Sequence, residues 1–192
     1  LGGEVLVTHR PMTDASIYSK GRNAAYPVVD LQTSMPLVSA YTNTDGRGGR
    51  YSFSYHYDQG RVGYTGIGWL GFRAVKMTQD SNARFSEVLY GQDWPGNGLV
   101  ARNGIYNQNG VALGTTDLTY RDVATNALQA KGIHQFVRAG EKYSAYADSH
   151  GGARLYTLEK VYEYDAFGNV SLISDLGQPG VTTTSRFNCF RY

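Results

Sequence analysis

The side chains best suited to acid–base or metal chemistry are four histidines, His9, His56, His134 and His150. No two of them stand two or four residues apart, the spacing at which a strand or a helix presents two ligands to one metal ion. The sequence therefore predicts no metal site and no cofactor. His56 is the most suggestive, because Asp58 follows it and could orient the imidazole as a base or as a glycan contact. An ordinary half-exposed histidine is the competing interpretation.

Four aspartates provide the other candidate chemistry, because two carboxylates at a defined separation hydrolyse glycosidic bonds. They are Asp58, Asp80, Asp93 and Asp165. Each stands at a turn signal, where an aspartate accepts hydrogen bonds from nearby backbone N–H groups. We therefore predict turn-stabilising roles, no catalytic residue and no enzymatic activity. The single cysteine, Cys189, excludes an intrachain disulfide and is predicted to be a small core residue.

Two tryptophans, Trp69 and Trp94, and 16 tyrosines offer broad aromatic surfaces. Aromatic rings on a sheet can stack on sugars, so one hypothesis is a glycan-binding module with Trp69, Trp94 and His56 as possible contacts. The other hypothesis is structural, because aromatic side chains on a sheet more often cover core.

The composition of the chain narrows the possible classes of protein. The chain has 192 residues, of which 41% are hydrophobic and 18% are charged, as in a folded domain rather than a disordered chain. Its formal net charge of +2 is too small to predict a nucleic-acid partner. No apolar run approaches the roughly 20 residues of a membrane-spanning helix. We expect one soluble domain or a segment of a longer polypeptide.

Alternation of apolar and polar residues, the period of a β-strand, runs through most of the chain. It is clearest in Gly49 to Asp58, where Tyr51, Phe53, Tyr55 and Tyr57 share one face. Glycine turn signals separate such stretches, which predicts an all-β fold: an antiparallel, meandering sheet of many short hairpin-connected strands. The other predicted strands are Glu4 to His9, Pro36 to Thr44, Leu70 to Thr78, Arg84 to Tyr90, Leu99 to Tyr106, Leu113 to Tyr120, Lys142 to Tyr146, Leu155 to Tyr164, Val170 to Ser174 and Val181 to Tyr192.

One segment, Asp122 to Lys131, has a helical rhythm, but it is short and lacks capping signals, so helix and loop both stay open. No linker interrupts the strands, and residues 1–192 are therefore expected to form a single all-β segment. A sheet of many strands exposes unpaired backbone groups at its edges. Closure into a barrel, folding into a sandwich or continuation into further sheet would satisfy them.

A tyrosine–aspartate pair near the carboxyl end resembles the YD repeat of Rhs proteins. The motif occupies residues 162–170 and consists of Tyr162, Tyr164, Asp165, Gly168 and Asn169. Its residues suit a hairpin, because Asp165 can accept bonds from backbone N–H groups at the strand end and Gly168 can adopt the positive φ of the turn. The sequence contains one clear YD unit.

An upstream segment resembles the region before the YD repeats in the B component of insecticidal Tc toxin complexes and in Salmonella-virulence-plasmid-type toxins. A glycine-rich turn at 60–68 leads into a Leu-Gly-Phe-Arg strand, and a Gln-Asp-aromatic-Pro turn follows at 92–95. Stretches at 13–20, 26–32 and 35–39 resemble the same region. The residues expected to shape this segment are Gly68, Leu70, Gly71, Phe72, Asp93 and Pro95.

This resemblance implies a fold and a function. The strands of such proteins build a spiralling β-shell that encloses a toxic carboxyl-terminal polypeptide and hands it to a delivery component. The chain is then expected to be a structural, non-enzymatic wall segment of a secreted bacterial toxin. Its expected partners are the remainder of its own polypeptide, the enclosed cargo and the delivery component. Glycan binding through exposed aromatics is the alternative.

Overall fold

A computed structural model gives the fold and describes residues 3–148, 152–178 and 186–189. Within these ranges nearly all regular structure is β-strand, so the predicted all-β class is confirmed. The strand β10 (Val100–Tyr106) contributes residues to two compact units. The expectation of one continuous segment stays a prediction. The first unit comprises residues 1–100 and 105–110, and the second comprises residues 101–104 and 111–192.

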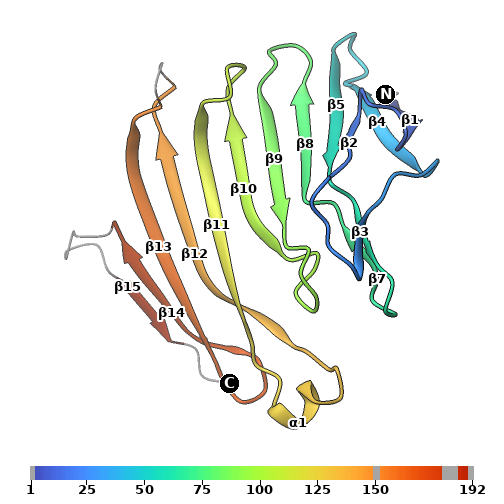
Figure 1. Ribbon diagram of the computed structural model, residues 1–192. Helices are drawn as coiled ribbons and strands as arrows, with labels where there is room; N and C mark the ends of the chain where they lie inside the picture. Colours follow the sequence, from blue (N-terminus) through green and yellow to red (C-terminus); the bar gives the residue numbers. More distant parts are fainter. Residues whose placement is uncertain (1–2, 149–151, 179–185, 190–192) are drawn as a thin grey trace. The chain divides into compact units, whose positions relative to one another are not determined.

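The first unit is built on an antiparallel sheet whose strands pair in the order β1, β4, β5, β8 and β9 (Figure 1). Their bounds are Val5–Pro11 for β1, Pro36–Thr44 for β4, Arg50–Asp58 for β5, Ala74–Gln79 for β8 and Phe85–Tyr90 for β9. β4, β5 and β9 lie where alternating apolar and polar residues predict strands. Every residue of the edge strand β1 is exposed.

A second, smaller antiparallel sheet in the first unit contains β3 (Val28–Asp30), β6 (Arg61–Gly63) and β7 (Gly68–Gly71). The sequence predicts a single strand over Leu70 to Thr78, and this prediction is wrong. The chain leaves the small sheet at Gly71, and β8 begins at Ala74 in the other sheet. The φ of Gly71 is 89°, a left-handed conformation that interrupts an extended strand.

The hydrophobic core of the first unit is small, and residues outside the long strands form much of it. Its buried members are Met12, Ile17, Tyr18 and Leu37. The short strand β2 (Tyr18–Ser19) pairs in parallel with β5, an element that the sequence pattern does not reveal. The Tyr18 hydroxyl donates to the backbone oxygen of Leu31 and accepts the Gly60 N–H at 3.0 Å. The one polar atom that Tyr18 carries into the core is therefore satisfied.

The aromatic face predicted for β5 is present and extends onto its neighbours. Tyr41 of β4 stacks on Phe53 with ring centroids 4.8 Å apart, and Tyr57 packs against Phe72 at 4.9 Å. Tyr55 lies between them, 6.1 Å from Tyr41 and 6.2 Å from Tyr57. Aromatic pairs of this kind add about 0.5–1.5 kcal/mol each beyond the burial of their area, so the row stiffens this face of the sheet.

The second unit is a meander in which β11, β12, β13, β14 and β15 pair in sequence order, all antiparallel (Figure 1). Their bounds are Ala112–Asp122 for β11, Phe136–Tyr146 for β12, Arg154–Tyr164 for β13, Val170–Gly177 for β14 and Arg186–Cys189 for β15. The strand predicted from Lys142 begins earlier, at Phe136, because pairing with β11 continues through a bulge. Of the strand predicted over Val181 to Tyr192, only 186–189 are described.

One helical turn, α1 (Asn126–Gln129), lies in the connection between β11 and β12 (Figure 1). The segment Asp122 to Lys131 is therefore mostly loop. Thr125 precedes the turn without a side-chain cap, and no residue of α1 is buried, so little packing stabilises it. The loop is closed instead by Asp122, whose Oδ2 lies 2.6 Å from Nδ1 of His134.

Hydroxyl and charged side chains pair across one face of the second unit's meander. Thr115, Ser144 and Thr157 occupy paired positions across three strands and are 6%, 5% and 6% exposed. The hydroxyls of Ser144 and Thr157 lie 3.1 Å apart. In the next row Nζ of Lys142 lies 2.7 Å from Oε1 of Glu159. Polar cross-strand pairs therefore hold this face together.

Candidate functional site

The tyrosine–aspartate motif forms the hairpin between β13 and β14. Oδ1 of Asp165 accepts the N–H of Phe167 at 2.9 Å and that of Asn169 at 2.8 Å. The side-chain amide of Asn169 donates to the other carboxylate oxygen at 3.0 Å. These bonds, that of the Asn169 side chain first, hold the pKa of Asp165 below its usual range. Gly168 has a φ of 88°, which completes the turn.

The two tyrosines of the motif fasten β13 to its neighbour β12. The Tyr164 hydroxyl donates to the backbone oxygen of Arg138 at 2.8 Å, and the Tyr162 hydroxyl donates to Oε2 of Glu141 at 3.2 Å. The guanidinium of Arg121 lies 5.7 Å from the centre of the Tyr164 ring. Burial and then the charge of Glu141 raise the pKa of Tyr162, so its hydroxyl keeps its proton and stays a donor.

The Asp165 turn has two counterparts in the first unit, at positions where only the glycine turn signals Asp45-Gly46 and Asn109-Gly110 are visible in the sequence. Oδ1 of Asp45 accepts the N–H groups two and four residues on, at 2.7 and 3.0 Å. Oδ1 of Asn107 accepts the N–H two residues on at 3.0 Å. In each turn the third residue on is a glycine with positive φ: Gly48 at 95°, Gly110 at 79° and Gly168 at 88°. An Asp or Asn three residues before a Gly is the signal that identifies all three.

The segment around β7 contributes one of the best-buried side chains of the first unit. Leu70 is 1% exposed, and Phe72 packs edge-on against Trp69 with ring centroids 5.2 Å apart. Gly68 and Gly71 flank them with φ of 74° and 89°, where residues with a Cβ are strained. The two glycines therefore set the turns that deliver Leu70 and Phe72 to the core.

Gln92 begins the Gln-Asp-aromatic-Pro turn, but it is not among the residues expected to shape this segment. Its side chain ties the segment around β7 to the turn after β9. Gln92 is 8% exposed, and its Nε2 donates to the backbone oxygens of Gln59 at 2.6 Å and Gly71 at 3.0 Å. Asp93 is exposed and Pro95 is half-buried. The Gln92 side-chain amide therefore links this turn to the segment around β7. The spacing of residues in the turn does not indicate which polar side chain makes that link.

A second missed feature is a buried ion pair that joins β3 to β6. Nε of Arg61 lies 2.9 Å from Oδ1 of Asp30, and the two side chains are 18% and 7% exposed. Oδ2 of Asp30 accepts the Ala24 N–H at 2.9 Å, and Arg61 also donates to Oδ1 of Asn23 at 2.6 Å. Burial acts to raise the pKa of Asp30, but the bonds from Ala24 and Arg61 outweigh it and lower that pKa.

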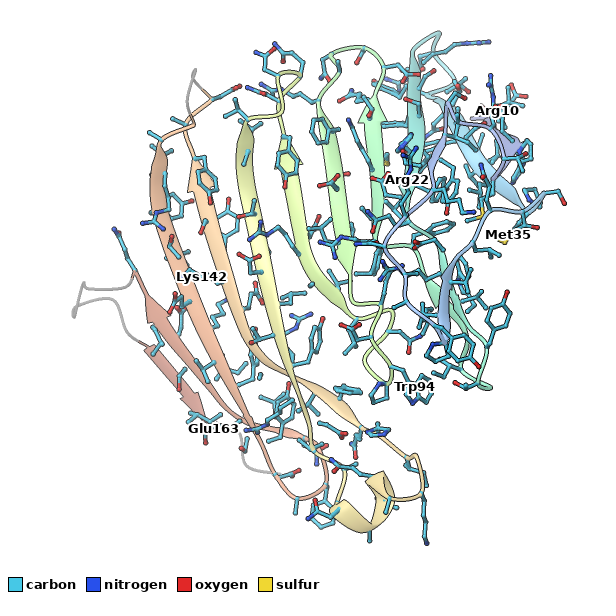
Figure 2. All side chains as sticks on the ribbon, viewed as in Figure 1. Arg10, Arg22, Met35, Trp94, Lys142 and Glu163 are labelled. Carbon is cyan, nitrogen blue, oxygen red and sulfur yellow. The ribbon has the colours of Figure 1, made fainter. Side chains whose placement is uncertain are left out.

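The residues predicted as glycan contacts do not converge. His56 and Tyr57 are neighbours on β5 and point to opposite faces of the sheet. Trp69 lies on the side of Tyr57, because both rings pack against Phe72. Trp94, labelled in Figure 2, is 54% exposed in the turn after β9. One sugar cannot contact both His56 and Trp69, and separate contacts by the tryptophans stay a prediction.

His56 lies in a polar pocket of the first unit, on the face away from the aromatic row. Its Nε2 is 2.8 Å from Oγ of Ser19 and 3.5 Å from Oδ1 of Asp58, as the spacing of His56 and Asp58 indicates. Its Nδ1 is 3.4 Å from the backbone oxygen of Ser16. Both ring nitrogens have partners, so the surroundings fix the orientation of the imidazole.

The other candidate residues are dispersed. Asp80 accepts the hydroxyl of Ser54 at 3.0 Å, and His9 is exposed on β1. In the described ranges no three His, Cys, Asp or Glu side chains gather as metal ligands do. Among the same residues, no helix is long and apolar enough to cross a membrane. His150 and the side chain of Cys189 lie outside the described part of the chain.

Comparison with known proteins places the fold. No protein-family model and no curated protein matches the sequence. TcdB2-TccC3 without its hypervariable C-terminal region matches with a TM-score of 0.61 and 11% identity, over 82% of this chain and 10% of that chain. TcdB2-TccC3-Cdc42 matches with 0.57 and 11%, over 82% and 11% of the two chains. TcdB2-TccC3 matches with 0.56 and 11%, over 77% and 10%.

The chain thus spans about a tenth of the length of the solved chains it matches. At this level of identity the likeness concerns the fold. The chain has the fold of a segment of these Tc toxin complex chains.

Proposed function

We propose that the chain is a wall segment of a Tc-toxin-like shell, which encloses a toxic polypeptide until it is delivered. The observation that carries the proposal is the match of 82% of the chain to 10% of a TcdB2-TccC3 chain, at a TM-score of 0.61. A segment of that extent forms only part of a wall. In this proposal the cargo is enclosed by a longer polypeptide that contains this segment and carries YD repeats. In this proposal the protein is a secreted virulence factor, and the segment is not an enzyme.

The interactions in the chain support a mechanical role. Antiparallel strands with continuous backbone hydrogen bonds form a barrier that an extended polypeptide cannot cross without breaking several bonds at once. The Asp45, Asn107 and Asp165 turns close the ends of hairpins with side-chain bonds. Tyr162 and Tyr164 add bonds between neighbouring strands. The mechanism is steric, since the wall separates its cargo from the solvent.

The edge strand β1 supports membership in a larger sheet. Val5, Leu6 and Val7 are 63%, 61% and 44% exposed, and β1 has β4 as its only neighbour in the sheet order of the described residues. An edge with exposed β-branched residues and unpaired backbone groups invites another strand. In the proposed shell, a further strand of the same polypeptide lies against β1.

Protease protection of the cargo tests the proposal. The longest natural polypeptide that contains this segment is digested with trypsin, and the fate of its carboxyl-terminal region is followed by mass spectrometry. The cargo region is expected to survive in the native protein and to be cleaved in a Leu70→Asp variant, whose wall is disrupted by a buried charge. Equal cleavage of the cargo region in both proteins contradicts enclosure.

A second candidate function, glycan binding, is favoured by the exposure of Trp69 and Trp94, which are 42% and 54% exposed. A glycan array with the Trp69→Ala and Trp94→Ala variants tests it. Loss of a reproducible glycan signal in either variant, with an unchanged thermal midpoint, supports this function. The absence of any signal for the native chain rejects it.

A further inference from the structure

The polar pocket around His56 encloses about 510 Å³ on one face of the first unit's main sheet. Residues from β1, β4, β5 and β8 line it, together with the Ser16 segment. All of them belong to the same compact unit. The pocket is large enough for a monosaccharide, and it lies on the face opposite to the aromatic row.

Small side chains explain why the sheet is hollow at this place. Thr8 pairs with Ala40, Ala40 pairs with Ser54, and Ser54 pairs with Thr78, so the four form one row across four strands. Cross-strand partners share a face, and none of these side chains is long enough to fill the space above its neighbours. The floor therefore combines three hydroxyls with the methyl groups of Thr8, Ala40 and Thr78. The Ser54 hydroxyl donates to Asp80 at 3.0 Å, and all three hydroxyl oxygens can accept a bond from a hydroxylated ligand.

Basic side chains stand around this floor. His56 and Lys76 are cross-strand partners, and Arg10 of β1, which is labelled in Figure 2, also lines the pocket. The Lys76 ammonium lies 4.0 Å from the centre of the Phe85 ring, which fixes its position. Arg10 is held by Asp14, 3.1 Å from its Nη1. The basic groups are therefore positioned before any ligand arrives.

The permanent charges that line the pocket, those of Arg10 and Lys76, are both positive. Arg10, His56 and Lys76 line it, and no carboxylate does so among the described residues. Outside the lining, Asp14 pairs with Arg10, Asp58 lies 3.5 Å from His56, and Glu87 is the cross-strand partner of Lys76, although no carboxylate of the described residues lies within 4 Å of the Lys76 ammonium. An anionic group in the pocket would add a charge-assisted bond to the ring contact that Phe85 makes with this ammonium.

We propose that this pocket binds a sugar that carries an anionic group, with Lys76 and Arg10 contacting the anion and Thr8, Ser54 and Thr78 contacting sugar hydroxyls. The anion is a carboxylate or a phosphate, which share the oxygen chemistry that ammonium and guanidinium groups recognise. This site is independent of the proposed wall function, and either can fail without the other. It also differs from the exposed-tryptophan hypothesis, because its contacts lie on the opposite face of the sheet.

Titration of the full 192-residue chain followed by NMR tests the proposal. Side-chain signals of His56 and backbone signals of Ser54 and Thr78 are monitored while D-glucuronate, D-glucose 6-phosphate or D-glucose is added. We expect saturable changes with at least one anionic sugar and at least tenfold weaker binding of glucose, because glucose cannot form the charge-assisted bond to Lys76 or Arg10. Saturation with glucuronate alone identifies a carboxylate, and saturation with glucose 6-phosphate alone identifies a phosphate.

Two variants and a control sharpen the result. Lys76→Gln should weaken binding of the anionic sugar about tenfold, and Ala40→Leu should abolish it by filling the floor. Lys131→Gln, an exposed change outside the pocket, should leave it unchanged. Each variant is first compared with the native chain by thermal unfolding. Absence of saturable shifts with both anionic sugars, equal binding of glucose, or equal loss in Lys131→Gln and Lys76→Gln overturns the proposal.

Discussion

Tyr164 donates its hydroxyl hydrogen to the backbone oxygen of Arg138 at 2.8 Å, which fastens the end of β13 to β12. The next residue, Asp165, turns the chain back by accepting bonds from Phe167 and Asn169. The tyrosine–aspartate pair thus performs two separate tasks at one strand end. The tyrosine joins neighbouring strands, and the aspartate closes the hairpin. In the Asp45 turn Thr44 stands where the tyrosine would be, and its hydroxyl accepts the Glu4 N–H at 2.9 Å, so a shorter side chain performs the first task there.

Replacing the Asp165 carboxylate should open the hairpin. In Asp165→Ala the N–H groups of Phe167 and Asn169 lose their acceptor, so we expect faster hydrogen exchange at the Asn169 amide and a lower thermal midpoint. Asp165→Asn keeps an Oδ1 acceptor, as Asn107 provides in its own turn, and should retain most of the protection. If exchange at Asn169 is the same in Asp165→Ala and the native chain, the carboxylate does not hold the turn.

The core of the first unit should depend on Leu70. This side chain is 1% exposed, so Leu70→Ala is expected to lower the free energy of unfolding by about 2–4 kcal/mol, measured by urea denaturation. Leu155 is 60% exposed, and Leu155→Ala should change the free energy by less than about 0.5 kcal/mol. Similar losses in the two variants would mean that Leu70 does not occupy the core.

The ion pair between Arg61 and Asp30 should be sensitive to truncation. Arg61→Ala leaves the Asp30 carboxylate, which is 7% exposed, without its charged partner. We expect the free energy of unfolding to fall by about 2–4 kcal/mol. The loss is limited because the Ala24 N–H still donates to Asp30. Arg61→Lys should recover part of the loss, because one ammonium cannot reproduce the fork that reaches both Asp30 and Asn23. Arg50 is exposed, so Arg50→Ala is the control. If Arg61→Ala lowers the free energy of unfolding by no more than this control does, the pair of Arg61 and Asp30 does not stabilise the fold.

The loop between β11 and β12 should respond to acid through Asp122. Bonds from His134 first, and then from the Ala124 N–H, lower the pKa of Asp122 from 3.8 to about 2. A carboxyl whose pKa is lower in the folded chain stabilises the fold above pH 3.8, and this contribution is lost as the pH falls through about 2.

The backbone NMR signal of Ala124 reports this transition, because its N–H donates to the Asp122 carboxylate at 3.0 Å. We expect the signal to hold its position down to about pH 3 and to move with a midpoint near 2. In Asp122→Asn the signal should not titrate between pH 5 and pH 2. A native midpoint near the ordinary value of about 4 would show that His134 does not hold the carboxylate.

Strands could be predicted from the sequence where one face packs and the other meets water. The alternation in β4 and β5 arises from that asymmetry, and the limits of these two strands follow it closely. In the second unit β12 begins six residues before the predicted Lys142, because its pairing with β11 continues through a bulge. The prediction over Leu70 to Thr78 failed because apolar residues continue through Gly71 although the backbone turns there. β2, β3 and β6 are too short for alternation to distinguish them from loop.

The candidate sites divide in the same way. Asp165, Gly168 and Asn169 lie within five consecutive residues, so their hairpin is readable from local spacing. Gln92 bonds to Gln59, 33 positions away, and Arg61 bonds to Asp30, 31 positions away. Pairs so distant along the chain cannot be predicted from a single sequence. The pocket at His56 likewise depends on the register of four strands, which only the fold supplies.

Electron microscopy of the longest natural polypeptide that contains this segment tests the central claim most directly. The proposed wall function predicts a hollow particle in which the sheets of the first and second units are found in the wall and additional density lies inside. A solid particle, or these sheets packed in a compact domain with no enclosed space, would contradict it.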